Sequence, residues 1–157
     1  MISENLKAIG RIKIFLEFED RRQHTINFHN TVLLSGRNAL AASLANQIGN
    51  SYDFFISRMI FGNGGTQGGI PKYVDTGRNG LFGITQSVKP VFATIDPNVT
   101  SRVIFTSIMG ADEANGVTLN EMALQMNNGD LYSMATFADL NKTSAMKITF
   151  NWTLDFI

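Results

Sequence analysis

The chain has 157 residues, enough for one domain with a sizeable core, and 44% of them are hydrophobic, as in a globular protein. Thirteen basic residues balance thirteen acidic ones, so the chain lacks the excess positive charge with which proteins bind nucleic acid or anionic membranes. The absence of cysteine excludes disulfides and thiolate metal sites. We therefore expect a single domain over residues 1–157 that binds neither nucleic acid nor membranes.

The first predicted strand covers residues 11–20, where apolar side chains alternate with charged ones. Phe15 interrupts the polar side of this alternation and has no evident internal role. A charged turn and a second alternating segment follow, so residues 11–32 are predicted to form an antiparallel hairpin.

Residues 35–48 give the strongest helix signal in the chain. Leu40, Leu44 and Ile48 recur every four residues and would form one apolar stripe. Ser35 is a suitable N-cap and Gly49 a suitable C-cap. The pattern predicts one helix packed across a face of the sheet.

A strand predicted over residues 54–61 leads into a long glycine-rich connection at 62–80. Five glycines lie between Gly62 and Gly69, but no Gly-Lys-Ser/Thr motif follows, so a phosphate-binding loop is not predicted. Loops of this length are usually functional or disordered. We expect this one to be mobile or to be ordered by a partner.

Residues 81–95 predict a strand that is broken near Pro90, and a further strand follows over residues 102–109. Within 117–126 the apolar side chains change face at Asn120 and Glu121, which predicts a β-bulge. An Asn-Gly turn then leads to a strand over residues 131–137 and a loop to residue 145.

The last segment, residues 147–157, alternates more strictly than any other. Its apolar positions are predicted to form a wall of the core: Ile148, Phe150, Trp152, Leu154 and Phe156. With about seven or eight strands, one helix and no repeated helical crossover, the chain is predicted to be a mainly β protein, an antiparallel β-sandwich with the helix packed on it.

No catalytic, cofactor-binding or metal-binding residues are predicted, and we expect no enzyme. His24 and His29 are five residues apart in a strand and so point to opposite faces. Asp112 and Glu113 lie in a polar loop between glycines, which is typical of a solvated turn and not of an acid–base pair.

The order of several motifs resembles a group of small structural proteins from tailed-bacteriophage particles. The resemblance covers most of the chain from residue 30 onward, while the N-terminal hairpin is additional. It rests on the following residues: Asn30, Thr31, Gly36, Arg37, Asn38, Ala39, Leu40 and Ala41; Ile60, Gly62 and Gly64; Asn115, Gly116, Glu121 and Leu124; Asn128, Gly129, Leu131 and Phe137; Lys142 or Lys147, Trp152 and Phe156.

The resemblance implies a non-enzymatic virion protein of the tail, neck, baseplate or fibre-attachment region, made in the cytoplasm of a host bacterium. Such a protein would bind copies of itself and other virion proteins. Glycines of the long connection and apolar residues without an evident internal role are the candidate interface: Phe15, Phe55, Gly62, Gly64, Gly65, Gly68, Gly69, Tyr73, Leu81 and Phe82. The alternatives are a capsid decoration protein and a carbohydrate-binding module.

Overall fold

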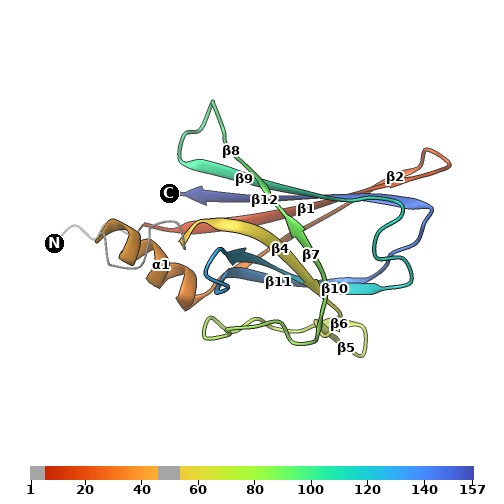
Figure 1. The fold of residues 1–157 in the computed structure, drawn as a ribbon, viewed down its shortest axis with the longest axis horizontal. Coiled ribbons are helices and arrows are strands. Elements are labelled where there is room, and N and C mark those ends of the chain that lie inside the picture. Colours follow the sequence, from red (N-terminus) through yellow and green to blue (C-terminus); the bar gives the residue numbers. More distant parts are fainter. Residues whose placement is uncertain (1–5, 46–53) are drawn as a thin grey trace.

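The computed structural model describes residues 6–45 and 54–157, which form twelve strands and one helix. Two five-stranded antiparallel sheets face each other as a β-sandwich (Figure 1). The first sheet has the order β2-β1-β12-β9-β8: β1 Ala8–Phe18, β2 Gln23–His29, β8 Phe92–Ile95, β9 Arg102–Met109 and β12 Met146–Phe156. The second has the order β3-β11-β10-β4-β7: β3 Thr31–Val32, β4 Ile56–Gly62, β7 Thr85–Pro90, β10 Thr118–Met126 and β11 Leu131–Asn141. The predicted mainly β fold with one helix is confirmed, with more strands than expected.

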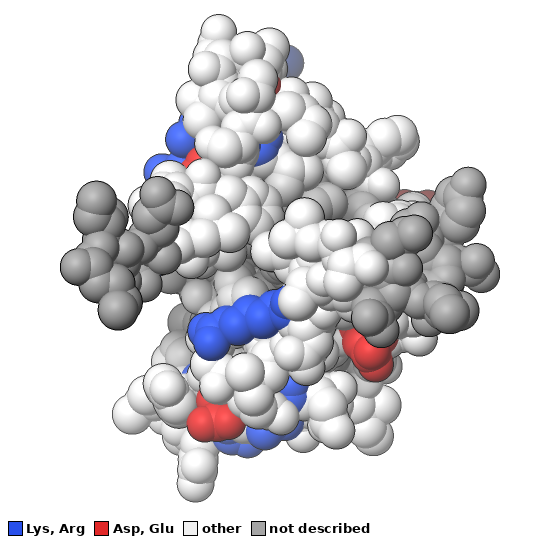
Figure 2. Space-filling view, turned by 90° about the vertical axis from the view of Figure 1, so that its left-hand side faces the viewer, with Lys and Arg blue, Asp and Glu red and all other residues white. Residues whose placement is uncertain are grey.

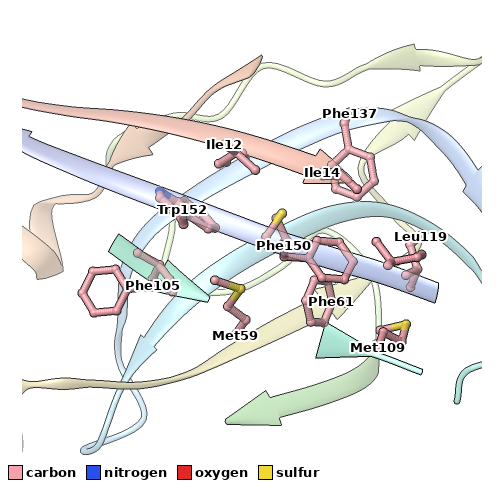
Figure 3. Packing of buried hydrophobic residues seen from close by; sticks show 14 of the residues in the cluster. Ile12, Ile14, Met59, Phe61, Phe105, Met109, Leu119, Phe137, Phe150 and Trp152 are labelled. Carbon is pink, nitrogen blue, oxygen red and sulfur yellow. The ribbon is translucent and has the colours of Figure 1, made fainter. Parts of the chain in front are cut away.

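The predicted strand at the end of the chain, β12, lies in the middle of the first sheet between β1 and β9. Ile148, Phe150 and Trp152 are fully buried, Leu154 is 1% exposed, and Phe156 is partly buried against the same core. Figure 3 shows Trp152 and Phe150 among side chains from both sheets, and the Phe150 ring centroid lies 4.5 Å from that of Phe61. Each large apolar side chain buried here contributes about 1.5–3 kcal/mol to stability.

The N-terminal hairpin forms from β1 and β2 and adds the edge strand β2 to the first sheet. It ends earlier than predicted, because Thr31 and Val32 cross over to pair with β11 in the second sheet. At the predicted break near Pro90 the chain crosses between the two sheets for a second time. Here β7 ends at Pro90 in the second sheet, and β8 begins at Phe92 in the first.

The helix α1 (Leu34–Leu44) packs against β11 with a different face from the predicted one. Leu44 is 82% exposed, whereas Gly36 and Ala39 are the buried positions. A Cβ atom on Gly36 would lie 2.4 Å from the carbonyl oxygen of Tyr132, so small residues let the helix approach the strand backbone.

The predicted helix caps also differ from the structure. The N-cap is Leu33, and the hydroxyl of Ser35 donates to the carbonyl of Leu131 instead of capping the helix. Ile48 and Gly49 lie outside the described residues. Strand β11 also runs to Asn141, where the sequence predicted a loop from residue 138.

The second sheet is buried on both faces. Its inner face packs on the first sheet, and its outer face carries a smaller cluster formed by Leu33, Ile60, Val74, Ala123, Leu131 and Met134. The chain from Gly62 to Gly83, with the short hairpin β5 (Thr66–Gln67) and β6 (Ile70–Pro71), covers this outer face (Figure 1). The glycine-rich connection is therefore a third layer of the domain.

Candidate functional site

The carboxylate of Glu121 holds the third layer in place. Glu121 is fully buried, and its oxygens accept three backbone N–H groups. Oε1 lies 2.9 Å from the nitrogen of Gly64 and 2.9 Å from that of Gly83, while Oε2 lies 2.7 Å from that of Phe82. Burial of a carboxylate is costly unless its oxygens are hydrogen-bonded, and here they are. Both ends of the connection are thus bound to one side chain.

The predicted β-bulge explains how Glu121 reaches this position. The register of β10 against β11 shifts between Leu119 and Glu121. Leu119 and Met122 both lie in the main core, so Asn120 and Glu121 together occupy the outer face of the second sheet. The bulge is confirmed, and it places two consecutive polar side chains under the glycine-rich connection.

Asn120 bonds to the first part of the same connection. Its Oδ1 accepts the backbone N–H of Gly65 at 2.7 Å. Its Nδ2 lies 3.1 Å from the carbonyl oxygen of Asn63 and 2.9 Å from Oδ1 of Asp139. Donation from Asn120 is the main cause that lowers the pKa of Asp139. Asn120 and Glu121 therefore form one polar anchor.

The glycines at this anchor are required by close approach. A Cβ atom on Gly62 would lie 2.5 Å from Oε1 of Glu121, one on Gly64 2.3 Å from the nitrogen of Gly83, and one on Gly65 2.3 Å from the carbonyl oxygen of Asn120. The expectation that this loop is mobile or ordered by a partner is wrong here, because the chain's own side chains order it.

Leu81 and Phe82, for which the sequence suggested no internal role, pack against the smaller cluster. The Arg78 guanidinium lies 3.6 Å from the centroid of the Phe82 ring and donates to the carbonyls of Gly80 and Leu81. These contacts give both apolar residues an internal use.

The other candidate interface residues lie on different parts of the surface. Phe15 is half-buried on the outer face of the first sheet, where it pairs with Thr25 and Thr149. Phe55 is 48% exposed and Tyr73 is 83% exposed. Gly68 and Gly69 form the exposed turn of the β5–β6 hairpin with φ values of 58° and 79°. The ten candidates thus do not form one patch.

The polar loop at 110–116 is more ordered than the solvated turn that the sequence predicted. Glu113 pairs with Lys89 and accepts the N–H of Gly110, and these bonds lower the pKa of Glu113. The Lys142 ammonium is buried below the loop and donates to Oδ1 of Asn115 at 3.0 Å. Burial lowers the pKa of Lys142.

The described residues contain neither a cluster of metal-binding side chains nor a membrane-spanning helix. His24 and His29 stay on the edge strand β2, and residues 6–45 and 54–157 contain no group of three or more His, Asp or Glu placed to hold a metal ion. In the same two ranges, no helix combines the length and hydrophobicity that crossing a membrane requires.

The sequence predicted both edge strands of the first sheet as strands but did not predict that they lie at its edges. Neither β2, with the sequence QHTINFH, nor β8, with FATI, contains Lys, Arg, Asp, Glu or Pro. Within the described residues, each pairs on one side only. Phe92 and Ile95 of β8 are 78% and 60% exposed. The lack of charge was visible in the sequence, but the position at an edge was not.

A groove lies at the end of the sandwich where α1 packs. Figure 2 looks onto this end and shows few charged side chains. The groove has a volume of about 660 Å³ and is lined by Leu6, Lys7, Ala8, Ile9, Val32, Arg37, Leu40, Ala41, Leu44, Tyr132 and Phe156. Its lining is mostly apolar, with two cationic side chains.

Comparison of the chain with protein-family models, curated proteins and solved structures finds no match.

Proposed function

We propose that the protein is a non-enzymatic structural component of a tailed-bacteriophage particle. It assembles in the tail, neck, baseplate or fibre-attachment region by binding copies of itself and other virion proteins. The copies associate through the edges of the first sheet.

The positions of the motif residues support this proposal. Gly62 and Gly64 meet Glu121 at the anchor of the third layer, although the motifs that contain them lie far apart in the sequence. Trp152 lies in the core, and Phe156 packs against it. These five residues thus maintain the fold, whereas other residues on which the resemblance rests, such as Asn38 and Asn128, are exposed.

The observation that carries self-association is the pair of unprotected edges. A free strand edge presents unpaired N–H and C=O groups, and natural proteins usually block such edges with charges, proline or a covering segment. Neither β2 nor β8 has a charge or proline, and β8 also exposes Phe92 and Ile95. The chemistry of such an edge selects another extended strand as its partner.

Because β2 and β8 are the opposite ends of one sheet, β8 of one copy fits beside β2 of the next. Such head-to-tail contacts form closed rings when the rotation between copies closes. A ring of identical subunits suits a particle that is built around a symmetry axis. The exposed side chains of Phe55 and Tyr73, which lie on different parts of the surface, are competing contact sites.

Thiol cross-linking tests the edges directly, because the chain contains no cysteine of its own. Thr25 of β2 and Thr94 of β8 are both exposed, and each is replaced by cysteine in a separate variant. We expect a short bis-maleimide to link the two variants when they are mixed. Linkage within Thr94→Cys alone would indicate two-fold pairing of β8 edges instead.

A matched control carries cysteine at Asn128, which is exposed in the β10–β11 turn away from both edges. If neither edge variant, alone or mixed, links more than Asn128→Cys, association through the edges is wrong. Mass spectrometry of purified phage particles tests the wider assignment, and absence of the chain from particles whose genome encodes it would overturn that assignment.

A further inference from the structure

We propose that Asn79 is a site of spontaneous deamidation, at which the third layer acquires an aspartate or isoaspartate. In this reaction the backbone nitrogen of the next residue attacks Cγ of the asparagine and loses its proton, and ammonia leaves. The resulting succinimide adds water and opens to either acid. No oxidant, cofactor or second protein is needed.

Asn-Gly sequences are the most susceptible, because glycine has no Cβ to hinder ring closure. The chain has four of them, beginning at Asn63, Asn79, Asn115 and Asn128. The sequence alone gives no reason for these four to differ.

In the structure the four sites differ in whether the backbone N–H of the glycine, the group that must attack, is already hydrogen-bonded. The nitrogen of Gly64 donates to Glu121 at 2.9 Å, that of Gly116 to the carbonyl of Lys142 at 2.9 Å, and that of Gly129 to the carbonyl of Met126 at 3.0 Å. Ring closure at these sites must first break that bond. Among the described residues, no acceptor for the N–H of Gly80 is found.

The side chains of Asn115 and Asn128 differ from that of Asn79 in the same direction, whereas Asn63 differs from it only through the bonded nitrogen of Gly64. Asn115 donates to the carbonyl of Ala111 and accepts from Lys142, and Asn128 bonds to Asp130. The amide of Asn79 is exposed and makes no hydrogen bond within the described part of the chain. A Cβ atom on Gly80 would meet no atom within 4 Å, so the backbone there has room to move toward Cγ.

The position gives the modification a structural consequence. Arg78 precedes Asn79 and bonds to the carbonyls of Gly80 and Leu81, just before the Phe82 and Gly83 nitrogens that hold Glu121. An isoaspartate lengthens the main chain by one methylene between Arg78 and these bonds. We expect the backbone amides of Phe82 and Gly83 to exchange hydrogen faster in the modified protein.

The test is peptide mapping of the full chain during incubation in mildly alkaline buffer. Conversion replaces the amino group of the side-chain amide with a hydroxyl, and the resulting increase in peptide mass is what the mapping detects. We expect the Asn79 peptide to convert at least about tenfold faster than those of Asn63, Asn115 and Asn128, since each protecting hydrogen bond must be broken first. In concentrated urea the four rates should become similar.

Two variants check the mechanism. Gly80→Ala has space for its methyl group and should slow conversion at Asn79 without unfolding the chain, and Asn79→Gln should abolish it. A folded protein in which another Asn-Gly site converts fastest overturns the proposal. So does a rate ranking in urea that matches the one in buffer, because the difference would then come from the sequence and not from the fold.

Discussion

Oε1 of Glu121 lies 2.9 Å from the backbone nitrogen of Gly64, which precedes it by 57 residues. Through this bond and the two from Phe82 and Gly83, one buried carboxylate closes a loop of about twenty residues over the second sheet. The glycine-rich segment has the appearance of an anion-binding loop, and the anion that it binds is a side chain of the same chain.

Replacing Glu121 with Gln should destabilise the protein by about 2–3 kcal/mol, because the amide turns one acceptor into a donor facing buried N–H groups. Urea unfolding measures the difference. The matched control is Glu19→Gln at an exposed position, which should change stability by less than about 0.5 kcal/mol. Equal stabilities of the two variants would show that the anchor contributes nothing.

Gly64→Ala should cost about 1–3 kcal/mol, because its Cβ would lie 2.3 Å from the nitrogen of Gly83. Gly80→Ala in the same connection has open space, and it should be neutral or stabilise by up to about 1 kcal/mol through the unfolded chain. Thermal unfolding of these two variants shows whether a loss of stability comes from the close approach at Gly64 or simply from replacing a glycine in the connection. A harmless Gly64→Ala would contradict the described approach of the two loop ends.

The strands, the bulge and the last core strand could be predicted because they depend on side-chain alternation within about ten residues. The third layer could not, since its anchor joins Gly64 and Glu121, whose meeting depends on the whole sheet order. The prediction of which helix face is buried was wrong for a related reason. Leu44 fits an apolar stripe, but packing on β11 selected Gly36, whose missing side chain lets the backbones approach.

Trp152→Ala should cost about 3–5 kcal/mol, as expected for a fully buried aromatic side chain. Trp152→Phe should cost less, because the indole N–H is buried without an acceptor among the described residues and phenylalanine removes it. Differential scanning calorimetry of both variants gives the order. An unchanged melting temperature in Trp152→Ala would contradict its place in the core.

Asp155 should make stability depend on pH in the acid range. Hydrogen bonding to Arg102 and the nearby charge of Arg11 lower the pKa of Asp155 below its ordinary value of 3.8. Because the folded-state pKa is the lower one, its contribution is complete above about pH 4 and is lost as the pH falls through the folded-state value. Glu113, Asp96 and Asp139 have lowered pKa values too and add to the same trend.

Asp155→Asn should therefore lose about 1–3 kcal/mol at neutral pH and show a shallower decline below pH 4 than the parent chain. Urea unfolding at a series of pH values measures both effects. Parallel curves for the two proteins would mean that Asp155 titrates in the folded state as it does in the unfolded chain.

Phe92→Lys should keep the fold and abolish self-association. Phe92 is 78% exposed on β8, so its replacement should alter the free energy of unfolding by less than about 0.5 kcal/mol. A lysine there gives the edge the charge that blocks strand pairing in natural sheets.

Tyr73→Lys is the matched control, since Tyr73 is 83% exposed and lies on the loop over the second sheet. Light scattering coupled to size-exclusion chromatography should find Phe92→Lys as a monomer at concentrations where the parent and Tyr73→Lys associate. The reverse pattern would place the contact between copies on the loop and not on the sheet edge. A parent chain that stays monomeric at every concentration would contradict self-association.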